Sequence, residues 1–131
     1  MNTKFDKILA EISAGELIDK ITILEIKKKK ITDNEKLKEV EKELISLNKT
    51  MNTFIEDKSE ISNFKEQLKD INLKLWDIED GKRLSEKNND FGNKFIELAR
   101  NVYKFNDERA KIKSKINQTL GSNIKEVKSH F

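Results

Sequence analysis

The chain has 131 residues, of which 39% are charged, and its 27 basic and 24 acidic side chains leave a net charge of +3. It contains no cysteine and no proline, which excludes disulfides and thiolate metal sites and argues against a turn-rich sheet protein. Acidic and basic residues are interspersed, so the small positive charge does not indicate nucleic-acid binding. No segment is long and apolar enough for a signal peptide or a membrane span. We therefore expect a single cytoplasmic domain over residues 1–131.

The sequence pattern of residues 1–31 predicts an arm followed by a central helix. Residues 1–12 carry Phe5, Ile8, Leu9 and Ile12 at helical spacing, but the segment is too short for an independent helix, so we expect a docked arm. Residues 13–31 are apolar almost all the way around a helix, which predicts a buried central helix. Ser13 and Glu16 have the spacing of a capping box at its start. Gly15 lies in the first turn of this helix, where a glycine lowers helix stability, so we expect close packing at this position.

A second helix is predicted after a break near Thr32 and Asp33. Thr32 with Glu35 has the spacing of another capping box. The apolar residues that follow are spaced like a coiled-coil stripe. This stripe comprises Leu37, Val40, Leu44, Leu47, Met51 and Phe54. The polar residues 56–59 predict the next turn, with Asp57 or Ser59 as a cap.

Two longer helices complete the predicted fold. The third spans about residues 61–87, with Gly81 marking a kink or a short loop, and the fourth is capped by Asp90 and ends at Gly121. The stripe of the fourth helix comprises Phe91, Phe95, Leu98, Val102, Phe105, Arg109, Ile112, Ile116 and Leu120. Residues 121–131 form a C-terminal tail.

Helix length sets the expected architecture. A helix of about thirty residues is near 45 Å long, more than a compact bundle of this size needs, so the last two helices should project as a hairpin. The fold class is all-α, an antiparallel helical bundle of four main helices with a long C-terminal helical hairpin. Apolar surface left uncovered on the hairpin predicts a homodimer.

Arg109 is the most informative polar residue. It occupies a stripe position between Phe105 and Ile112, where an unpaired charge is too costly. We expect it to face an acidic residue of the central helix, with Asp77 and Glu79 as alternatives. The central-helix candidates are Glu16, Asp19 and Glu25. A bidentate contact with one of them indicates a structural ion pair, whereas a cavity without a carboxylate indicates an anionic ligand.

Polar residues around Arg109 form the candidate ligand-binding site for a phosphate or carboxylate group. The set comprises Arg100, Tyr103, Asn106, Asp107, Arg109, Glu16, Asp19 and Lys20. The chain lacks a Gly-rich phosphate loop, a nucleophile elbow and an HExxH motif, and its only histidine is His130 near the end. We therefore expect no catalytic residue, no metal and no cofactor.

Four segments carry a family resemblance. They are EISAGELIDKITILEIK at 11–27, LWDIED at 75–80, LARNVYKFNDERAKIKSKIN at 98–117 and GS at 121–122. The chain resembles a bacterial and phage family of small all-helical proteins of unknown function, with no assigned activity. Genes of that family are often found near glycosyltransferase and surface-polysaccharide genes, which implies a cytosolic accessory role there.

A weaker resemblance is to the helical chorismate mutases, which open with a helix patterned like LIDKITILEIKKKKI. Their pocket uses an arginine of the first helix, whereas this chain has no arginine before Arg83, and Lys28 supplies a single charge. Taken together, we expect a non-enzymatic helical interaction or accessory protein with a protein partner or a small anionic ligand. The alternatives are a small enzyme or binding protein for an anionic metabolite and a weak nucleic-acid binder.

Overall fold

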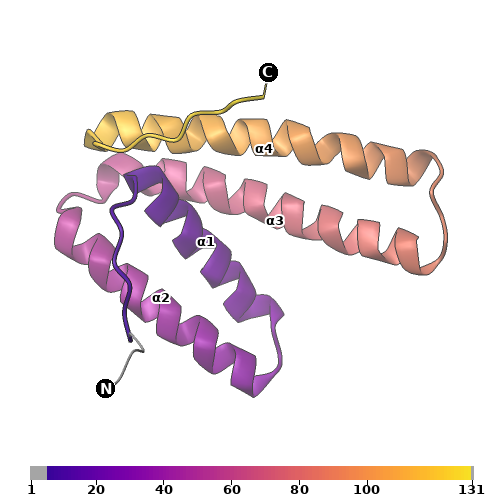
Figure 1. Ribbon diagram of the computed structural model, residues 1–131, viewed down its shortest axis with the longest axis horizontal. Helices are drawn as coiled ribbons and strands as arrows, with labels where there is room; N and C mark the ends of the chain where they lie inside the picture. Colours follow the sequence, from indigo (N-terminus) through magenta and orange to yellow (C-terminus); the bar gives the residue numbers. More distant parts are fainter. Residues whose placement is uncertain (1–5, 131) are drawn as a thin grey trace, which may run out of the picture.

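The computed structural model describes residues 6–130, and within them the chain forms four helices and no strand. These are α1 (Ala14–Lys30), α2 (Asn34–Phe54), α3 (Ser59–Lys87) and α4 (Asn93–Leu120). Helices α1 and α2 form a short antiparallel hairpin, and α3 and α4 form a longer one (Figure 1). Helix α1 packs against each of the other three. The predicted all-α fold with a long C-terminal hairpin is confirmed.

Helix α1 is the buried centre of the fold, as predicted. Its buried apolar side chains are Leu17, Ile18, Ile21, Leu24 and Ile26. At its start the Ser13 hydroxyl accepts a hydrogen bond from the backbone N–H of Glu16 at 3.2 Å. The Glu16 carboxylate binds Lys113 instead of returning to the cap, so only half of the predicted capping box is present.

Helix α2 covers one side of α1, with Val40, Leu44 and Met51 buried. Its N-cap is Asp33, whose carboxylate accepts from the N–H groups of Glu35 and Lys36, so the predicted cap at Thr32 was wrong by one residue. The predicted burial of Phe54 was also wrong. Its side chain is 78% exposed, because the helix ends there and the following residue, Ile55, turns into the core instead.

The turn before α3 has the predicted position. The Asp57 carboxylate accepts from the N–H of Ser59 at 2.9 Å and from its hydroxyl at 2.5 Å. Helix α3 then runs unbroken through Gly81, so the short loop that was one of the two predictions for this position is absent. A Cβ at Gly81 would lie 3.1 Å from a methyl of Leu98, so the glycine admits a neighbouring side chain of α4.

Helix α4 begins later than predicted. Its N-cap is Gly92, whereas the Asp90 carboxylate accepts from the N–H of Gly92 at 3.2 Å within the preceding turn. Phe91 therefore lies before the helix and outside its stripe, with its ring edge-on to Phe95. The helix ends, as predicted, at Gly121 in the left-handed conformation, with φ of 67°.

The hairpin has two differently supported halves. The connected apolar core reaches Leu75 on α3 and Phe105 on α4. We call residues 59–75 and 105–120 the inner half and residues 76–104 the outer half. The outer half extends beyond α1 and α2 (Figure 1). It consists of two helices and their turn, and a pair of helices cannot bury both of its faces.

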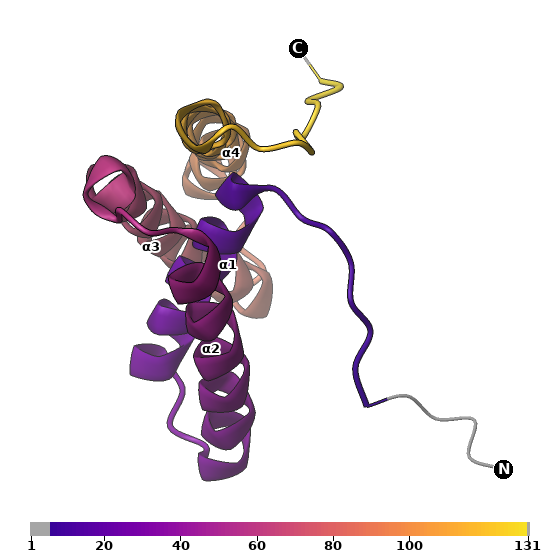
Figure 2. The same cartoon turned by 90° about the vertical axis from the view of Figure 1, so that its left-hand side faces the viewer.

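The two terminal segments differ. The described part of the arm, residues 6–12, is extended and exposed, and it leads away from the bundle (Figure 2). Ile8 and Leu9 are 88% and 90% exposed, so the predicted docking of the arm is not seen for these residues, and Phe5 lies outside the described part. The tail instead runs back along α4 (Figure 1). No helix within residues 6–130 combines the length and apolarity needed to cross a bilayer.

Candidate functional site

The centre of the candidate site is a buried ion pair between α1 and α4. The Arg109 Nε donates to Asp19 Oδ1 at 2.9 Å and its Nη2 donates to Asp19 Oδ2. Asp19 is fully buried. The prediction that Arg109 faces an acidic residue of the central helix is thereby confirmed. The alternative Glu25 lies instead near Lys65 and Lys69.

Two further side chains complete the hydrogen bonding of Asp19. The Asn72 amide of α3 donates to Asp19 Oδ1 and to Thr22 Oγ1, both at 2.9 Å. The Thr22 hydroxyl donates to the backbone carbonyl of Asp19 at 2.7 Å. A buried carboxylate is tolerated only when its acceptors are satisfied, and here donors from two other helices satisfy it. The network therefore fixes how α3 and α4 sit on α1.

Lys113 forms a second ion-pair cluster one helical turn after Arg109. Its Nζ lies 2.8 Å from Glu16 Oε2 and 2.8 Å from Glu126 Oε2 of the tail. The Lys113 side chain is only 8% exposed. It thus joins the first turn of α1 to the C-terminal tail.

The two basic groups keep their positive charge through these contacts. Hydrogen bonds to Asp19 raise the pKa of Arg109 above its ordinary value, against the effect of burial. Burial acts to lower the pKa of Lys113, but its hydrogen bonds to Glu126 and Glu16 outweigh burial and raise that pKa. Both side chains are therefore cations at neutral pH.

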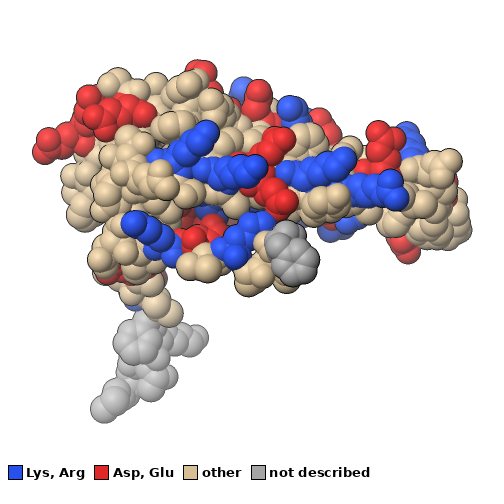
Figure 3. Space-filling model, turned by 90° about the horizontal axis from the view of Figure 1, so that it is seen from above, with Lys and Arg blue, Asp and Glu red and all other residues tan. Residues whose placement is uncertain are grey.

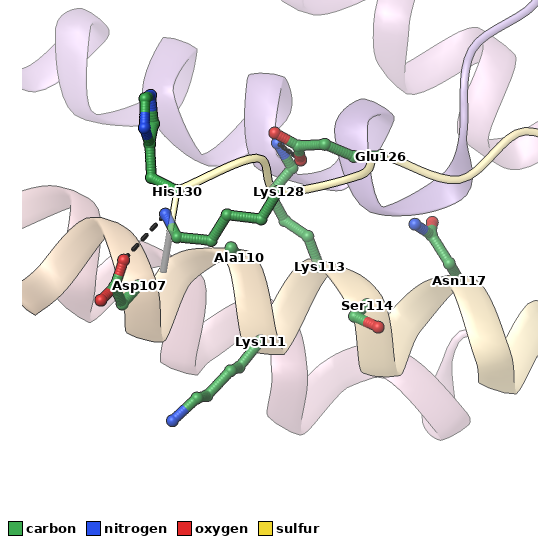
Figure 4. Close-up of a pocket in the computed structure, with 9 residues that line it drawn as sticks. All are labelled: Asp107, Ala110, Lys111, Lys113, Ser114, Asn117, Glu126, Lys128 and His130. Atoms are coloured by element: carbon green, nitrogen blue, oxygen red, sulfur yellow. Dashed lines mark ion pairs between the residues drawn. The ribbon is translucent and has the colours of Figure 1, made fainter. Parts of the chain in front are cut away.

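The tail lies over this part of α4. The Lys128 Nζ is 2.8 Å from Asp107 Oδ1, and Glu126 lies above Lys113 (Figure 4). Between the tail and α4 is a pocket of about 430 Å³. Its lining residues are Asp107, Ala110, Lys111, Lys113, Ser114, Asn117, Glu126, Lys128 and His130.

The start of α1 is seated directly on the end of α4. The N–H of Gly15 donates to Asn117 Oδ1 at 2.7 Å, and the N–H of Ala14 donates to the Ser122 hydroxyl at 2.9 Å. A Cβ at Gly15 would lie 2.5 Å from the backbone carbonyl oxygen of Lys113. The close packing predicted from this glycine is confirmed, and the contact uses helix N–H groups that have no partner within α1.

The structure brings together five of the eight predicted site residues. Asp19, Glu16, Arg109 and Asp107 take part in the ion pairs above, and Asn106 Oδ1 lies 3.5 Å from Arg109 Nη1. The other three residues, Arg100, Tyr103 and Lys20, are exposed and lie away from Arg109.

Helix geometry explains these exceptions. At about 100° per residue, Arg100 is roughly 180° around α4 from Arg109 and Tyr103 roughly 120° from it. Lys20 is likewise about 100° from Asp19 on α1. These three residues could not share a face with the ion pair, although they are close to its members in the sequence.

Several important residues were not predicted. Lys113 follows Arg109 by four residues and so faces the same way, a signal that was present in the sequence. Asn72 interrupts the apolar stripe of α3 between Leu68 and Leu75, which was a weaker signal. The roles of Glu126 and Lys128 had no local signal, because their partners, Lys113 and Asp107, lie on α4, far from the tail in the sequence.

The geometry favours a structural role for the Asp19–Arg109 pair. The fork of Arg109 is occupied by Asp19 in bidentate fashion, so it is not free to bind a ligand in the way that a chorismate-mutase-like pocket requires. Within residues 6–130 no three histidine or acidic side chains are grouped to hold a metal. A binding role for the predicted residues stays a prediction, and the pocket under the tail is where it applies.

Comparison with protein families gives a match that covers all four helices. Residues 8–131 match the model of a family of unknown function, DUF6165. The chain belongs to this family. The expected membership of a small all-helical family without an assigned activity is thereby confirmed. The DUF6165 match includes the tail as well as the four helices. Neither the curated proteins nor the solved structures compared with the chain give a match.

Proposed function

We propose that this DUF6165 protein is a non-enzymatic interaction protein that forms a homodimer through the outer half of its hairpin. The observation that carries the proposal is an exposed stripe on α4, formed by Ile96, Arg100 and Tyr103. Ile96 is 45% and Tyr103 is 58% exposed, and Arg100 is exposed between them. These residues are four and three positions apart, so they share one face of the helix.

The residue types in this stripe are those expected at an interface. Tyrosine and arginine are enriched among the side chains that dominate binding energy. Leu84 and Phe91 are also exposed in the outer half, so the hairpin has further apolar surface that its own two helices do not cover.

A second copy of the chain is the partner that this surface fits. A hollow on α4 is lined by Ile96 and Arg100 of the stripe and by the charged residues Glu97 and Lys104. In a two-fold pairing each surface meets its own copy, so a surface of mixed charge is complementary to itself. Two hairpins packed in this way would make a four-helix bundle, which buries the exposed face of each.

The oligomeric state tests the proposal. Light scattering should give a dimer at high micromolar concentration for the wild type and a monomer for the Ile96→Glu/Tyr103→Glu variant. Ile45 of α2 is an exposed isoleucine outside the hairpin, so the Ile45→Glu variant is the matched control and should remain dimeric. A monomeric wild type would remove the dimer from the proposal.

We extend the proposal to a setting in cell-envelope glycan synthesis, on the basis of the family resemblance alone. Co-purification from cells should recover a protein of that pathway, and recovery should be measured for both the wild type and the Ile96→Glu/Tyr103→Glu variant. Absence of any such partner would argue against this setting without affecting the dimer.

The nucleic-acid alternative is less well supported. On the face that carries α4 and the tail, basic side chains are interspersed with acidic ones and do not form a continuous basic stripe (Figure 3). Neutralising phosphates requires clustered cations, whereas these cations have acidic neighbours. Binding to duplex or single-stranded DNA at low salt would contradict this interpretation.

A further inference from the structure

The tail is attached to α4 through polar contacts. Residues 123–130 are all exposed, and the apolar side chain of Val127 faces solvent. The contacts are the ion pairs of Glu126 with Lys113 and of Lys128 with Asp107, together with a hydrogen bond from Asn123 to Glu11 at 3.0 Å. Glu126, Lys128 and Asp107 are partly exposed, so water and salt compete for these charges, and the nearly buried Lys113 keeps Glu16 as a partner when Glu126 leaves. The tail can therefore detach without disturbing the apolar core.

The surface beneath the tail has a defined charge pattern. It presents the Lys113 cation, which is almost fully buried under the tail, and the Asp107 carboxylate two turns earlier on α4. In the tail, Glu126 pairs with Lys113 and Lys128 pairs with Asp107, so each charge on α4 meets the opposite charge (Figure 4). The pocket between the two segments leaves room for groups larger than these side chains.

The dimensions fit an extended segment that runs antiparallel to α4. Glu126 and Lys128 are two residues apart, which is about 6.6 Å in an extended chain. Asp107 and Lys113 are six residues apart, which is about 9 Å along the helix and roughly 120° around it. Long lysine side chains span the difference.

Charge balance decides which class of ligand this surface fits. Arg109 is already paired with Asp19, and Lys113 with Glu16, so neither of these two cations is free to balance a small anion. A segment with both an acid and a base satisfies Lys113 and Asp107 together, as the tail does.

We propose that the α4 surface around Lys113 and Asp107 is a docking site for an extended segment of a partner protein in which an acidic residue precedes a basic residue by two positions. The tail occupies this site in the free protein and competes with the partner. The site lies on the inner half of the hairpin and is separate from the proposed dimer surface.

A peptide-binding experiment on the full chain tests this inference. The probe is a fluorescent synthetic peptide with the sequence of residues 121–130, titrated at low salt and read by anisotropy. The Glu126→Gln/Lys128→Gln variant should bind it about tenfold more tightly than the wild type if the tail closes the site in about nine molecules of ten. The Lys125→Gln variant keeps both tail ion pairs and should behave as the wild type does.

Further variants identify the docking surface. Adding Asp107→Asn to the double variant should weaken binding, and a peptide with its acid and base exchanged should not bind. Asp107 is partly exposed, so Asp107→Asn tests the surface without altering a buried residue. A change at the nearly buried Lys113 would not have this advantage. Circular dichroism checks the fold of every variant, and the Ile96→Glu/Tyr103→Glu change should leave peptide binding unaltered.

Four outcomes would overturn the inference. They are equal affinity of the wild type and the double variant, absence of binding to both, equal binding of the charge-exchanged peptide, and equal stabilisation of the double variant by inorganic phosphate. The last would assign the surface to small anions. A wild-type dimer that dissociates in the double variant would overturn it as well, because the site would then belong to the tail of a second copy.

Discussion

The two halves of the α3–α4 hairpin contain the same kinds of residue in different surroundings. The inner half packs on α1 and contains Arg109, which pairs with the fully buried carboxylate of Asp19 on α1. The outer half contains the Glu79–Arg83 pair at 2.9 Å, with both side chains largely exposed. The comparison shows that contact distance alone does not indicate how much an ion pair matters for stability. Burial determines how much free energy of unfolding is lost when one partner is removed.

Removing one partner from each pair should give the largest contrast. Asp19→Ala leaves the Arg109 charge and the Asn72 amide without their acceptor inside the protein, and should destabilise the fold by about 3–5 kcal/mol. Arg83→Ala should change stability by at most about 0.5 kcal/mol, because water replaces the lost contact. Urea unfolding followed by circular dichroism measures both, and similar losses for the two variants would contradict the comparison.

Two leucines of α3 extend the comparison to apolar packing. Leu68 is fully buried in the inner half and Leu84 is 56% exposed in the outer half. Leu68→Ala should cost about 2–5 kcal/mol by leaving a cavity, whereas Leu84→Ala should stay within about 0.5 kcal/mol. The measurement is the same urea titration, made at low protein concentration so that self-association does not contribute. A large effect at Leu84 would show that the outer half is packed more tightly than its exposure indicates.

Two helical glycines that face α4 provide a matched pair. Gly15→Ala places a methyl against a backbone carbonyl of α4, which cannot move aside, and we expect a loss of about 1–3 kcal/mol. Gly81→Ala meets only a leucine side chain that can shift, and the gain in helix propensity of about 1 kcal/mol offsets the crowding. Thermal unfolding should therefore show a lower Tm for the first and a Tm near the wild-type value for the second. The reverse order would refute the close contact between α1 and α4.

The smallest expected effect is a pH dependence confined to the inner half. The pKa of Lys113 is raised in the folded protein above its ordinary value of 10.5, so its contribution is complete below that value. The contribution is lost as pH rises through the higher folded pKa. A Lys113→Met variant should therefore lose less stability than the wild type when the pH is raised above about 10.5. Lys111→Met, a change at an exposed lysine, should follow the wild type.

Much of the fold could be predicted because helix periodicity is a local property. The apolar pattern of α1 and the stripes of α2 and α4 identified much of the core, and the position of Arg109 within a stripe indicated its acidic partner. Errors occurred where the outcome depends on distant neighbours. Ile8 and Leu9 belong to an apolar helical pattern in the arm, yet both are exposed, and Phe54 lies at a helix end where the chain turns away from the core.

The candidate site was predicted in part for the same reason. Asn106 and Arg109 share a face of α4, whereas Arg100 was included for its closeness in sequence although it lies on the opposite face. A stricter use of the helical repeat would have replaced Arg100 with Lys113. The contribution of the tail could not be predicted, because its ion pairs join residues that no local pattern connects.

The contact of Ala14 and Gly15 with Asn117 and Ser122 also bears on how the chain is made. Synthesis proceeds from the N-terminus, so α1 leaves the ribosome long before the residues that receive its first turn exist. Until α4 is complete, the central helix can pair with α2 and α3 but lacks its third neighbour. A nascent chain therefore keeps part of its most apolar helix uncovered until α4 has been synthesised. A product truncated before Asn117 would remain in that condition, which makes it a substrate for chaperones and proteases.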